Sequence, residues 1–428
     1  MDISLNYGKS QLSVSLPDTL DVKVIRKPEM PLLDDPVAAL EAAFANPDGG
    51  APLAELAAGA TTACILICDI TRPVPNGIFL APLLRALLAA GLDKTNITIV
   101  VATGLHRPNE GDELAELVGD PWVLENFRVE NHFARDDAAH VSLGVTKSGT
   151  VVKIDKRFVN ADVRIATGLV EPHFMAGWSG GRKVIAPGIA HAETITAFHS
   201  ARFMEQPGCQ NCILDGNPLH AEQLEIMAML GGATALNVVI DEARRISLIN
   251  FGEVVESHLA AVDHVRAYAE VGVPERFSTV VTSAAGYPLD KTYYQTVKGM
   301  VGPMDILAPG GTLVIASACS EGMGSAEYVA SQRRLIEVGA EQFLRDIESK
   351  NHAAVDEWQT EMLLKPLRIG RVCLYTDGLS QAEFGLTGVT PAASVAAAVA
   401  EAVTAAGNNR VAVIPEGPYV VPRYRPEN

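Results

Sequence analysis

The sequence is poor in positive charge. Its 428 residues contain 34 lysines and arginines against 51 aspartates and glutamates, a formal net charge of −17. A nucleic-acid-binding protein would carry a basic face, so this balance argues against a nucleic-acid partner. It leaves room for an anionic substrate, because a few local arginine and lysine side chains set the electrostatic field in a cleft.

Long apolar runs are also absent. A membrane-spanning helix needs about 20 consecutive apolar residues, and the apolar run Ala63–Ile67 has only the length of a buried strand. The first ten residues, MDISLNYGKS, lack the basic and apolar regions of a secretory signal. We therefore expect a cytoplasmic protein without a membrane partner.

Cysteine is scarce, and the spacing of the cysteines does not indicate a disulfide framework. Scattered cysteines in a large chain indicate reduced thiols rather than disulfides. Cys209 and Cys212 form a CxxC pair, but no second pair of zinc ligands follows nearby, and the βαβ context of a redox motif is missing. We expect this pair to be incidental. The six cysteines are Cys64, Cys68, Cys209, Cys212, Cys319 and Cys373.

Strand-like and helix-like segments alternate in both halves of the chain. Buried parallel strands read as short apolar runs, and several such runs are followed by helical patterns. The main predicted strands are Ala63–Asp69, Asn96–Ala102, Asp162–Thr167, Ser278–Ser283, Thr312–Ala316, Arg371–Tyr375 and Arg410–Pro415. The main predicted helices are Val37–Ala45, Ile78–Ala90, Glu110–Val118, Pro218–Leu230, Gly252–Val271, Lys291–Met300 and Pro391–Ala406.

The length exceeds one ordinary core, so two domains are expected. We place the boundary where the long helix ends near Gly272, which gives domains 1–272 and 273–428. The alternation predicts two α/β domains with largely parallel sheets and an active-site cleft between them. The tail 417–428, with three prolines, is expected to be extended and able to return to the first domain.

Three predicted strands of the first domain end at polar residues. Asp69 and Arg72 follow the first of these strands, His106 follows the second, and His173 follows the third. In an open α/β sheet such strand ends meet at one edge, where ligands bind. The sequence therefore predicts a site at this edge.

The stretch Glu171–His199 is the most unusual part of the chain. A glycine-rich turn, Gly177–Arg182, precedes Lys183, and His199 follows a predicted short helix that begins near Glu193. Glycines allow close approach of the backbone to a ligand, and free amides in such a turn suit an anion. The stretch thus offers an amine and two histidines beside a binding turn.

Four segments together resemble one known family. EPHFMAGWSGGRKVIAPGI, which begins at Glu171, closely resembles the signature of the lactate racemase family, the nickel-pincer-nucleotide enzymes. Asp69–Pro73, Thr103–Pro108 and Tyr294–Gly299 resemble further family motifs and occur in the family's order. The resemblance spans almost the whole chain, and no single one of these motifs would be specific alone.

The resemblance implies an isomerase that inverts C2 of lactate or a related 2-hydroxy acid by hydride abstraction and return. It implies that Lys183 carries the nickel-pincer nucleotide covalently, that His199 is a nickel ligand, and that His106 and His173 are the acid/base pair. The remaining implied contacts are Asp69, Thr71 and Arg72 to cofactor, and Arg72, Tyr294, Gln295 and Lys298 to substrate. Cofactor-maturation enzymes are implied partners, and a homo-oligomer is left open.

The chemistry of a 2-hydroxy acid explains why these residue types are needed. The C2 proton is very weakly acidic beside a carboxylate, so removing hydride while a base takes the hydroxyl proton avoids a carbanion. The protein has no hydride acceptor of its own and must bind one. Histidine suits the base for each enantiomer, and arginine offers a bidentate fork for the carboxylate.

Several alternatives stay open at this stage. A nicotinamide-dependent 2-hydroxy acid dehydrogenase would require a GxGxxG fingerprint after an early strand, and none is found. A pyridoxal-phosphate enzyme with a Schiff base on Lys183 fits the two histidines poorly. A non-enzymatic small-anion binding protein explains Arg72 and the glycine turn but needs no acid/base histidines. We expect His132, His140, His191 and His220 to be structural.

Overall fold

The computed structural model describes residues 1–426, which divide into two compact units. The N-unit comprises Glu29–Phe198 and Ile213–Ala267. The C-unit comprises Met1–Pro28, His199–Cys212 and the residues from Tyr268 onward. Among the described residues, no helix has both the length and the apolar character that crossing a membrane would require.

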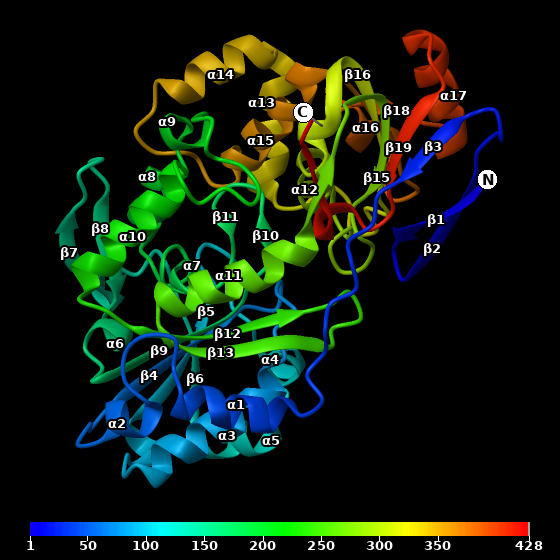
Figure 1. Ribbon diagram of the computed structural model, residues 1–428. Coiled ribbons are helices and arrows are strands. Elements are labelled where there is room, and N and C mark those ends of the chain that lie inside the picture. The colour runs from blue at the N-terminus through cyan, green and yellow to red at the C-terminus, as the bar shows by residue number, and fades with distance from the viewer. Residues whose placement is uncertain (427–428) are drawn as a thin grey trace. The chain divides into compact units, whose positions relative to one another are not determined.

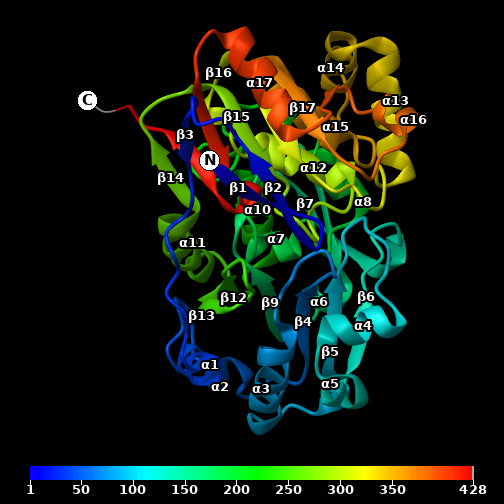
Figure 2. The same ribbon diagram turned by 90° about the vertical axis from the view of Figure 1, so that its right-hand side faces the viewer.

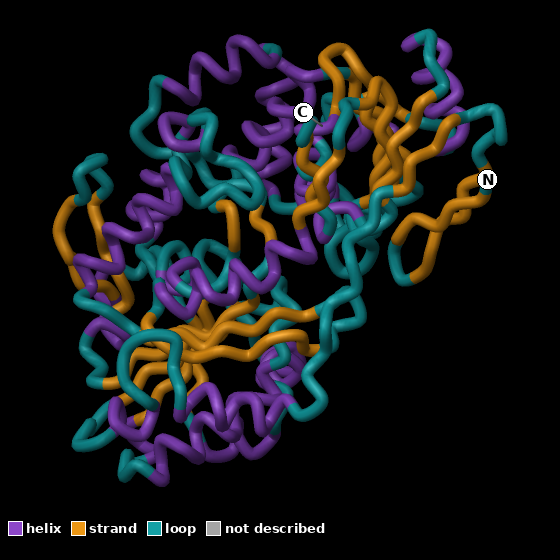
Figure 3. The backbone as a smooth tube through the Cα atoms, viewed as in Figure 1, coloured by secondary structure: helices purple, strands orange, loops and turns teal. Residues whose placement is uncertain are grey.

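The N-unit is built on a six-stranded sheet; Figure 3 draws its strands, like all strands of the protein, in orange. The strand order is β13-β12-β9-β4-β5-β6, and every neighbouring pair is parallel except β12 and β13. Strands β4, β5 and β9 are almost entirely buried because both faces of the sheet are covered. The strands are β4 (Ala63–Cys68), β5 (Ile97–Ala102), β6 (Arg128–Asn131), β9 (Val163–Leu169), β12 (Thr234–Ile240) and β13 (Ile246–Glu253).

Helices cover both faces of this sheet. Figure 1 shows α1, α2 and α3 on one face, where their apolar side chains join one core cluster with the strands. Helix α7 packs against β4 and β9. The helices of the unit are α1 (Pro36–Ala45), α2 (Leu53–Ala57), α3 (Asn76–Ala89), α4 (Gly111–Val118), α5 (Pro121–Asn126), α6 (Lys156–Val159), α7 (Arg182–Ile185), α8 (Ala192–Phe198), α10 (Pro218–Leu230) and α11 (Glu256–Ala269, whose last two residues fall in the C-unit).

Two small hairpins complete the N-unit. Strand β7 (His140–Val145) pairs with β8 (Val151–Asp155), and β10 (Pro172–His173) pairs with β11 (Gly177–Trp178). Both pairs are antiparallel. The second hairpin follows β9 and precedes α7 in the chain, and it pairs His173 with Gly177, the first residue of the glycine-rich turn.

The C-unit contains a second six-stranded sheet, in which all strands are parallel. Its order is β18-β17-β16-β15-β19-β3. The strands are β3 (Asp21–Val24), β15 (Phe277–Ser283), β16 (Leu307–Ala316), β17 (Arg371–Tyr375), β18 (Thr390–Pro391) and β19 (Arg410–Ile414). Its helices are α9 (Ala201–Met204), α12 (Tyr293–Val301), α13 (Ala326–Val338), α14 (Ala340–Glu348), α15 (Glu357–Ile369), α16 (Gln381–Phe384) and α17 (Val395–Ala406).

Chain segments far apart in sequence meet inside the C-unit. Figure 2 shows the hairpin of β1 (Asp2–Tyr7) and β2 (Ser10–Ser15) beside β15, and apolar residues of both share one core cluster. Strand β3 pairs with β19 at the edge of the sheet. The tail strand β20 (Val421–Tyr424) pairs with β14 (Glu270–Val273).

The predicted fold class is confirmed, since both sheets are largely parallel and alternate with helices. The units differ from the predicted ranges 1–272 and 273–428, because Met1–Pro28 and His199–Cys212 group with the C-terminal part of the chain. The predicted helix Gly252–Val271 is shorter, because Gly252 and Glu253 extend β13 and Glu270 begins β14.

Candidate active site

The loops after β4 and β5 bring Asp69 and His106 into contact. Asp69 directly follows β4 and is 5% exposed, while His106 lies in the loop after β5. Nδ1 of His106 lies 2.6 Å from Oδ2 of Asp69. The hydroxyl of Thr71 donates to Oδ1 of the same carboxylate at 2.6 Å. Both oxygens of Asp69 are therefore engaged.

The ionisation of Asp69 determines the proton position on His106. Burial raises the pKa of the Asp69 carboxyl, but His106, Thr71 and Arg72 outweigh burial and leave the pKa below its ordinary value. An ionised carboxylate only accepts hydrogen bonds, so Nδ1 of His106 is the donor. The neutral ring of His106 then has its lone pair on Nε2, which is the state of a base.

His173 has the opposite arrangement. It is 7% exposed and lies in β10, where its Nδ1 accepts hydrogen bonds from the backbone N–H groups of Met175 at 3.3 Å and Ala176 at 3.1 Å. A neutral ring that accepts at Nδ1 carries its proton on Nε2. The two histidines thus present different Nε2 states: an acceptor on His106 and a donor on His173.

Lys183 lies on α7 and is partly buried. Burial and, to a lesser extent, the nearby guanidinium groups of Arg72 and Arg182 lower the pKa of its amine from 10.5 to about 7. An ordinary lysine is almost fully protonated at neutral pH, whereas the lowered pKa of Lys183 leaves part of its amine neutral there. The structure therefore provides a nucleophilic amine at the end of the glycine-rich turn.

The glycine-rich turn is held by contacts that only glycine permits. Gly180 and Gly181 have φ angles of 79° and 47°, and a Cβ on Gly181 would lie 2.7 Å from Cβ of His258. The turn is less open to an anion than the sequence suggests, because the amide of Gly181 donates to Asn237 at 3.1 Å and that of Ser179 donates to the Glu171 carbonyl at 3.0 Å. These glycines serve close packing in front of Lys183.

Arg182 is a functional candidate that sequence reasoning missed. It is fully buried; its Nε donates to Nδ1 of His220 at 2.7 Å, and its Nη1 lies 2.8 Å from Nε2 of His258. Burial and the charge of Arg182 lower the pKa of His220 to about 3, so that ring is neutral. In the sequence, an arginine beside the lysine expected to carry the cofactor is typical of a solvent-exposed position, and no local pattern indicates that it is buried.

Arg72 links the ends of β4 and β9. Its Nη1 lies 2.5 Å from Oε1 of Glu171, and both side chains are mostly buried. Neighbouring Arg72 contributes to the lowered pKa of the Lys183 amine and to that of the Asp69 carboxyl. Arg72 is therefore an electrostatic partner of both groups.

The expected substrate residues Tyr294, Gln295 and Lys298 lie together on α12 in the C-unit. The hydroxyl oxygen of Thr292 caps this helix by accepting a hydrogen bond from the backbone N–H of Gln295 at 3.3 Å. Nε1 of Trp358 donates to the Tyr294 hydroxyl at 3.4 Å, and Nε2 of Gln359 donates to the Tyr294 carbonyl. Helix α15 thus supports the Tyr294 end of α12.

One face of α15 also holds the segment His199–Cys212. The rings of His199 and Trp358 lie 5.0 Å apart between centroids. Nζ of Lys365 donates to the carbonyls of Met204 at 2.7 Å and Cys209 at 2.9 Å. Arg368 binds both carboxylate oxygens of Glu205. Residues 358, 365 and 368 share a helix face by their spacing, so α15 sets the position of the segment that begins with His199.

None of the six cysteines, all of which lie within residues 1–426, forms a disulfide. Cys209 and Cys212 are buried in the segment held by α15, and burial raises the pKa of the Cys209 thiol to about 12. Within residues 1–426, no group of three or more histidine, cysteine or acidic side chains is arranged to hold a metal ion.

Comparison with known proteins gives consistent matches over the whole chain. Residues 7–211 match the lactate racemase N-terminal domain, and residues 274–421 match the lactate racemase C-terminal domain. A lactate racemase of Thermoanaerobacterium thermosaccharolyticum is 32% identical over 99% of both chains. A lactate racemase of Lactiplantibacillus plantarum is 35% identical over 67% of this chain and 66% of its own.

Solved structures show the same relationship. The apoprotein structure of the T. thermosaccharolyticum lactate racemase superposes with a TM-score of 0.91, covering 99% of this chain and 100% of that one. A crystallised protein of Thermotoga maritima, 17% identical, superposes with a TM-score of 0.65 over 87% of this chain and 96% of its own. The second likeness concerns the fold alone.

Proposed function

The chain belongs to the lactate racemase family, and on that premise we propose that it inverts the C2 stereocentre of lactate or a related 2-hydroxy acid. The observation that carries the proposal is the combination, within the N-unit, of a lysine amine with a pKa of about 7 and a histidine oriented by a buried carboxylate. A small-anion binding protein would need neither feature.

The cofactor implied by the family resemblance is a nickel-pincer nucleotide attached to Lys183. The chain's residues fit such a group. The amine of Lys183 is partly neutral near pH 7 and can be acylated. His199, which packs on Trp358 of α15, is the one protein ligand of nickel that the resemblance implies. When bound, this group would accept the C2 hydride of the substrate and return it.

His106 and His173 are proposed to move the hydroxyl proton. Nε2 of His106 is an acceptor in the neutral ring, so His106 takes the proton from the hydroxyl of one enantiomer. His173 is proposed as the acid/base partner for the other enantiomer: in its neutral ring Nε2 donates a hydrogen bond to the keto oxygen, and the ring can release a proton to that oxygen only from its imidazolium form. Asp69 stabilises the imidazolium that forms on His106, as a carboxylate next to a protonated ring does.

Binding of the substrate carboxylate is assigned to residues that the resemblance identifies. Arg72 offers a guanidinium in the N-unit, and Tyr294, Gln295 and Lys298 lie on α12 of the C-unit. Asp69, Thr71 and Arg72 are also proposed contacts of the cofactor. The proposed maturation partners are the enzymes that synthesise and load the nucleotide.

A panel of 2-hydroxy acids tests the proposed activity. The protein is co-expressed with cofactor-maturation enzymes, and conversion of each enantiomer is followed by chiral chromatography. We expect racemisation of at least one acid, with retention of deuterium from 2-deuterated substrate in the inverted product. Complete exchange of that deuterium with solvent would indicate proton abstraction at C2 and contradict hydride return. His140→Gln, outside the proposed site, serves as the variant control.

A further inference from the structure

Two asparagines, Asn109 and Asn131, bind the loops that carry Asp69 and His106. Asn109 lies three residues after His106 and is 2% exposed. Its side-chain oxygen accepts a hydrogen bond from the backbone N–H of Ile70 at 3.2 Å. Its side-chain nitrogen donates to Oε1 of Glu113 at 2.5 Å. The Asn109 side chain therefore fixes the peptide group that directly follows Asp69.

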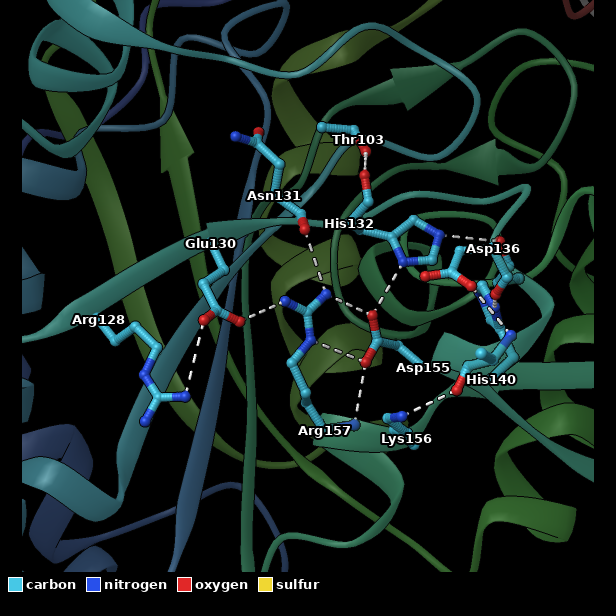
Figure 4. A network of polar contacts seen from close by, with 12 residues as sticks. Thr103, Arg128, Glu130, Asn131, His132, Asp136, His140, Asp155, Lys156 and Arg157 are labelled. Carbon is cyan, nitrogen blue, oxygen red and sulfur yellow. Dashed lines mark hydrogen bonds and ion pairs between the residues drawn. The ribbon is translucent and has the colours of Figure 1, made fainter.

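Asn131, the last residue of β6, holds the backbone of Asn109 from the other side. Oδ1 of Asn131 accepts from the N–H of Asn109 at 2.9 Å, and Nδ2 of Asn131 donates to the carbonyl of Asn109 at 2.8 Å. The next residue, His132, accepts the Thr103 hydroxyl at its carbonyl at 2.7 Å, as Figure 4 shows. The loop that carries His106 is thus fixed before it at Thr103 and behind it at Asn109.

These bonds join three neighbouring strand ends. Strands β4, β5 and β6 are adjacent in the sheet; Ile70 follows β4, Asn109 lies in the loop between β5 and α4, and Asn131 ends β6. Each asparagine both donates and accepts through its amide, which a carboxylate or an apolar side chain cannot do. Because each amide makes one donated and one accepted bond, it restrains the groups that it connects.

We propose that Asn109 is a positioning residue, which together with Asn131 keeps Asp69 and His106 at hydrogen-bonding distance. The importance of this bond for catalysis rests on the proposed function of His106. Asn109 acts on the reaction only through the loops, because its side chain is used on Ile70 and Glu113.

Nitrogen NMR of the His106 ring tests the inference on the protein without cofactor. Protein labelled with 15N-histidine is measured at about pH 8.5, above the ordinary histidine pKa, and His106 is assigned by its loss in His106→Gln. In the wild type, the two ring nitrogens should show one dominant tautomer with the proton on Nδ1. In Asn109→Ala we expect both shifts to move toward averaged values, because the ring is no longer held against the carboxylate.

Two further variants make the result decisive. Glu113→Gln keeps an acceptor for the Asn109 side chain and should leave the His106 signals unchanged. Asn131→Ala removes the two hydrogen bonds to the Asn109 backbone and should shift the His106 signals as Asn109→Ala does. If circular dichroism shows that Asn109→Ala does not fold, Asn131→Ala provides the test in its place. The proposal would be overturned if a folded Asn109→Ala protein showed the His106 signals of the wild type. If Asn109→Ala does not fold, the same result in Asn131→Ala would overturn it.

Activity separates this inference from the proposed function. In enzyme that carries the cofactor, Asn109→Ala should lower kcat by about 10- to 100-fold and leave KM for the substrate little changed. Losses of this size are typical when a residue that orients a reacting group, without touching the substrate, is removed. If His106→Gln racemises at the wild-type rate, the acid/base role of His106 is wrong, yet the NMR result on Asn109 still stands or falls by itself.

Discussion

The 2.6 Å hydrogen bond between Nδ1 of His106 and Oδ2 of Asp69 determines which nitrogen of His106 can act as a base. Asp69 is buried while the His106 side chain is about half exposed, so the fixed partner is the carboxylate and the ring is oriented by it. The same bond would stabilise positive charge on the ring after proton transfer.

Replacing Asp69 with asparagine should impair racemisation. The amide can donate to Nδ1 and would favour the tautomer with the proton on Nε2, so His106 would lose its function as a base. We expect kcat to fall roughly 100-fold or more, within the range of general acid–base catalysis. The measurement is the rate of racemisation as a function of pH. Asp93→Asn makes the same change at an exposed carboxylate that accepts from the Thr95 backbone and should leave racemisation at the wild-type rate; equal losses in both variants would contradict the assignment.

The lowered pKa of the Lys183 amine predicts unusual reactivity. Acylation of Lys183 by a limiting amount of an amine-specific reagent, followed by peptide mass spectrometry, should rise with pH through a midpoint near 7. Ordinary lysines should react with midpoints above about 10. Because Arg72 disfavours a second positive charge, Arg72→Met should move the Lys183 midpoint to higher pH. Arg107→Met, at an exposed arginine paired with Glu113, is the matched control and should leave it in place.

Acid stability should depend on His220. Its pKa is about 3 in the folded protein, mainly because of burial, and about 6.5 when unfolded. Between these values the unfolded chain binds one proton more than the folded chain, so the free energy of unfolding falls as pH decreases from about 6.5 toward 3. The slope from one such group is at most about 1.4 kcal/mol per pH unit. His220→Asn should flatten the dependence of urea-unfolding stability on pH; an unchanged slope would show that His220 is not neutral in the folded protein.

Lys365 should control the order of the segment that begins with His199. Its amine joins the carbonyls of Met204 and Cys209, and methionine retains the length of the side chain without the donors. Lys365→Met should therefore increase hydrogen exchange of peptides within His199–Cys212. Lys350→Met removes a lysine that binds Glu357 at the start of the same helix and should leave exchange in that segment as in the wild type. Equal protection in both variants would contradict the role of Lys365.

The sequence predicts the central strands well and the non-local pairings poorly. The apolar runs of β4, β5 and β17 are found with ends within two residues, because buried parallel strands are continuous apolar segments. Strand β3 has four residues and pairs with β19 near the other end of the chain, so no local pattern indicates its place. The region 120–158 is hard to predict because strands β6 and β7 are largely half-exposed and mixed in polarity.

The same limit applies to the candidate site. Strand ends bring Asp69 and His106 together by a general property of parallel sheets, so their contact follows from the sequence pattern. Arg182 and Trp358 escape prediction because their burial depends on distant partners: His220 and His258 for Arg182, and the His199 segment for Trp358. Asn109 is not predicted for the same reason, because its proposed role depends on its hydrogen bonds to Ile70, Glu113 and Asn131.

Attachment of the cofactor to Lys183 is tested most directly by intact mass. The wild type and Lys183→Ala are each co-expressed with cofactor-maturation enzymes. The intact mass of each protein is measured, and racemisation is measured on the same samples. We expect an added mass on the wild-type chain that maps to Lys183, and loss of both the added mass and racemisation in the variant. A Lys183→Ala protein that racemises its substrate at the wild-type rate would contradict the proposed role of Lys183.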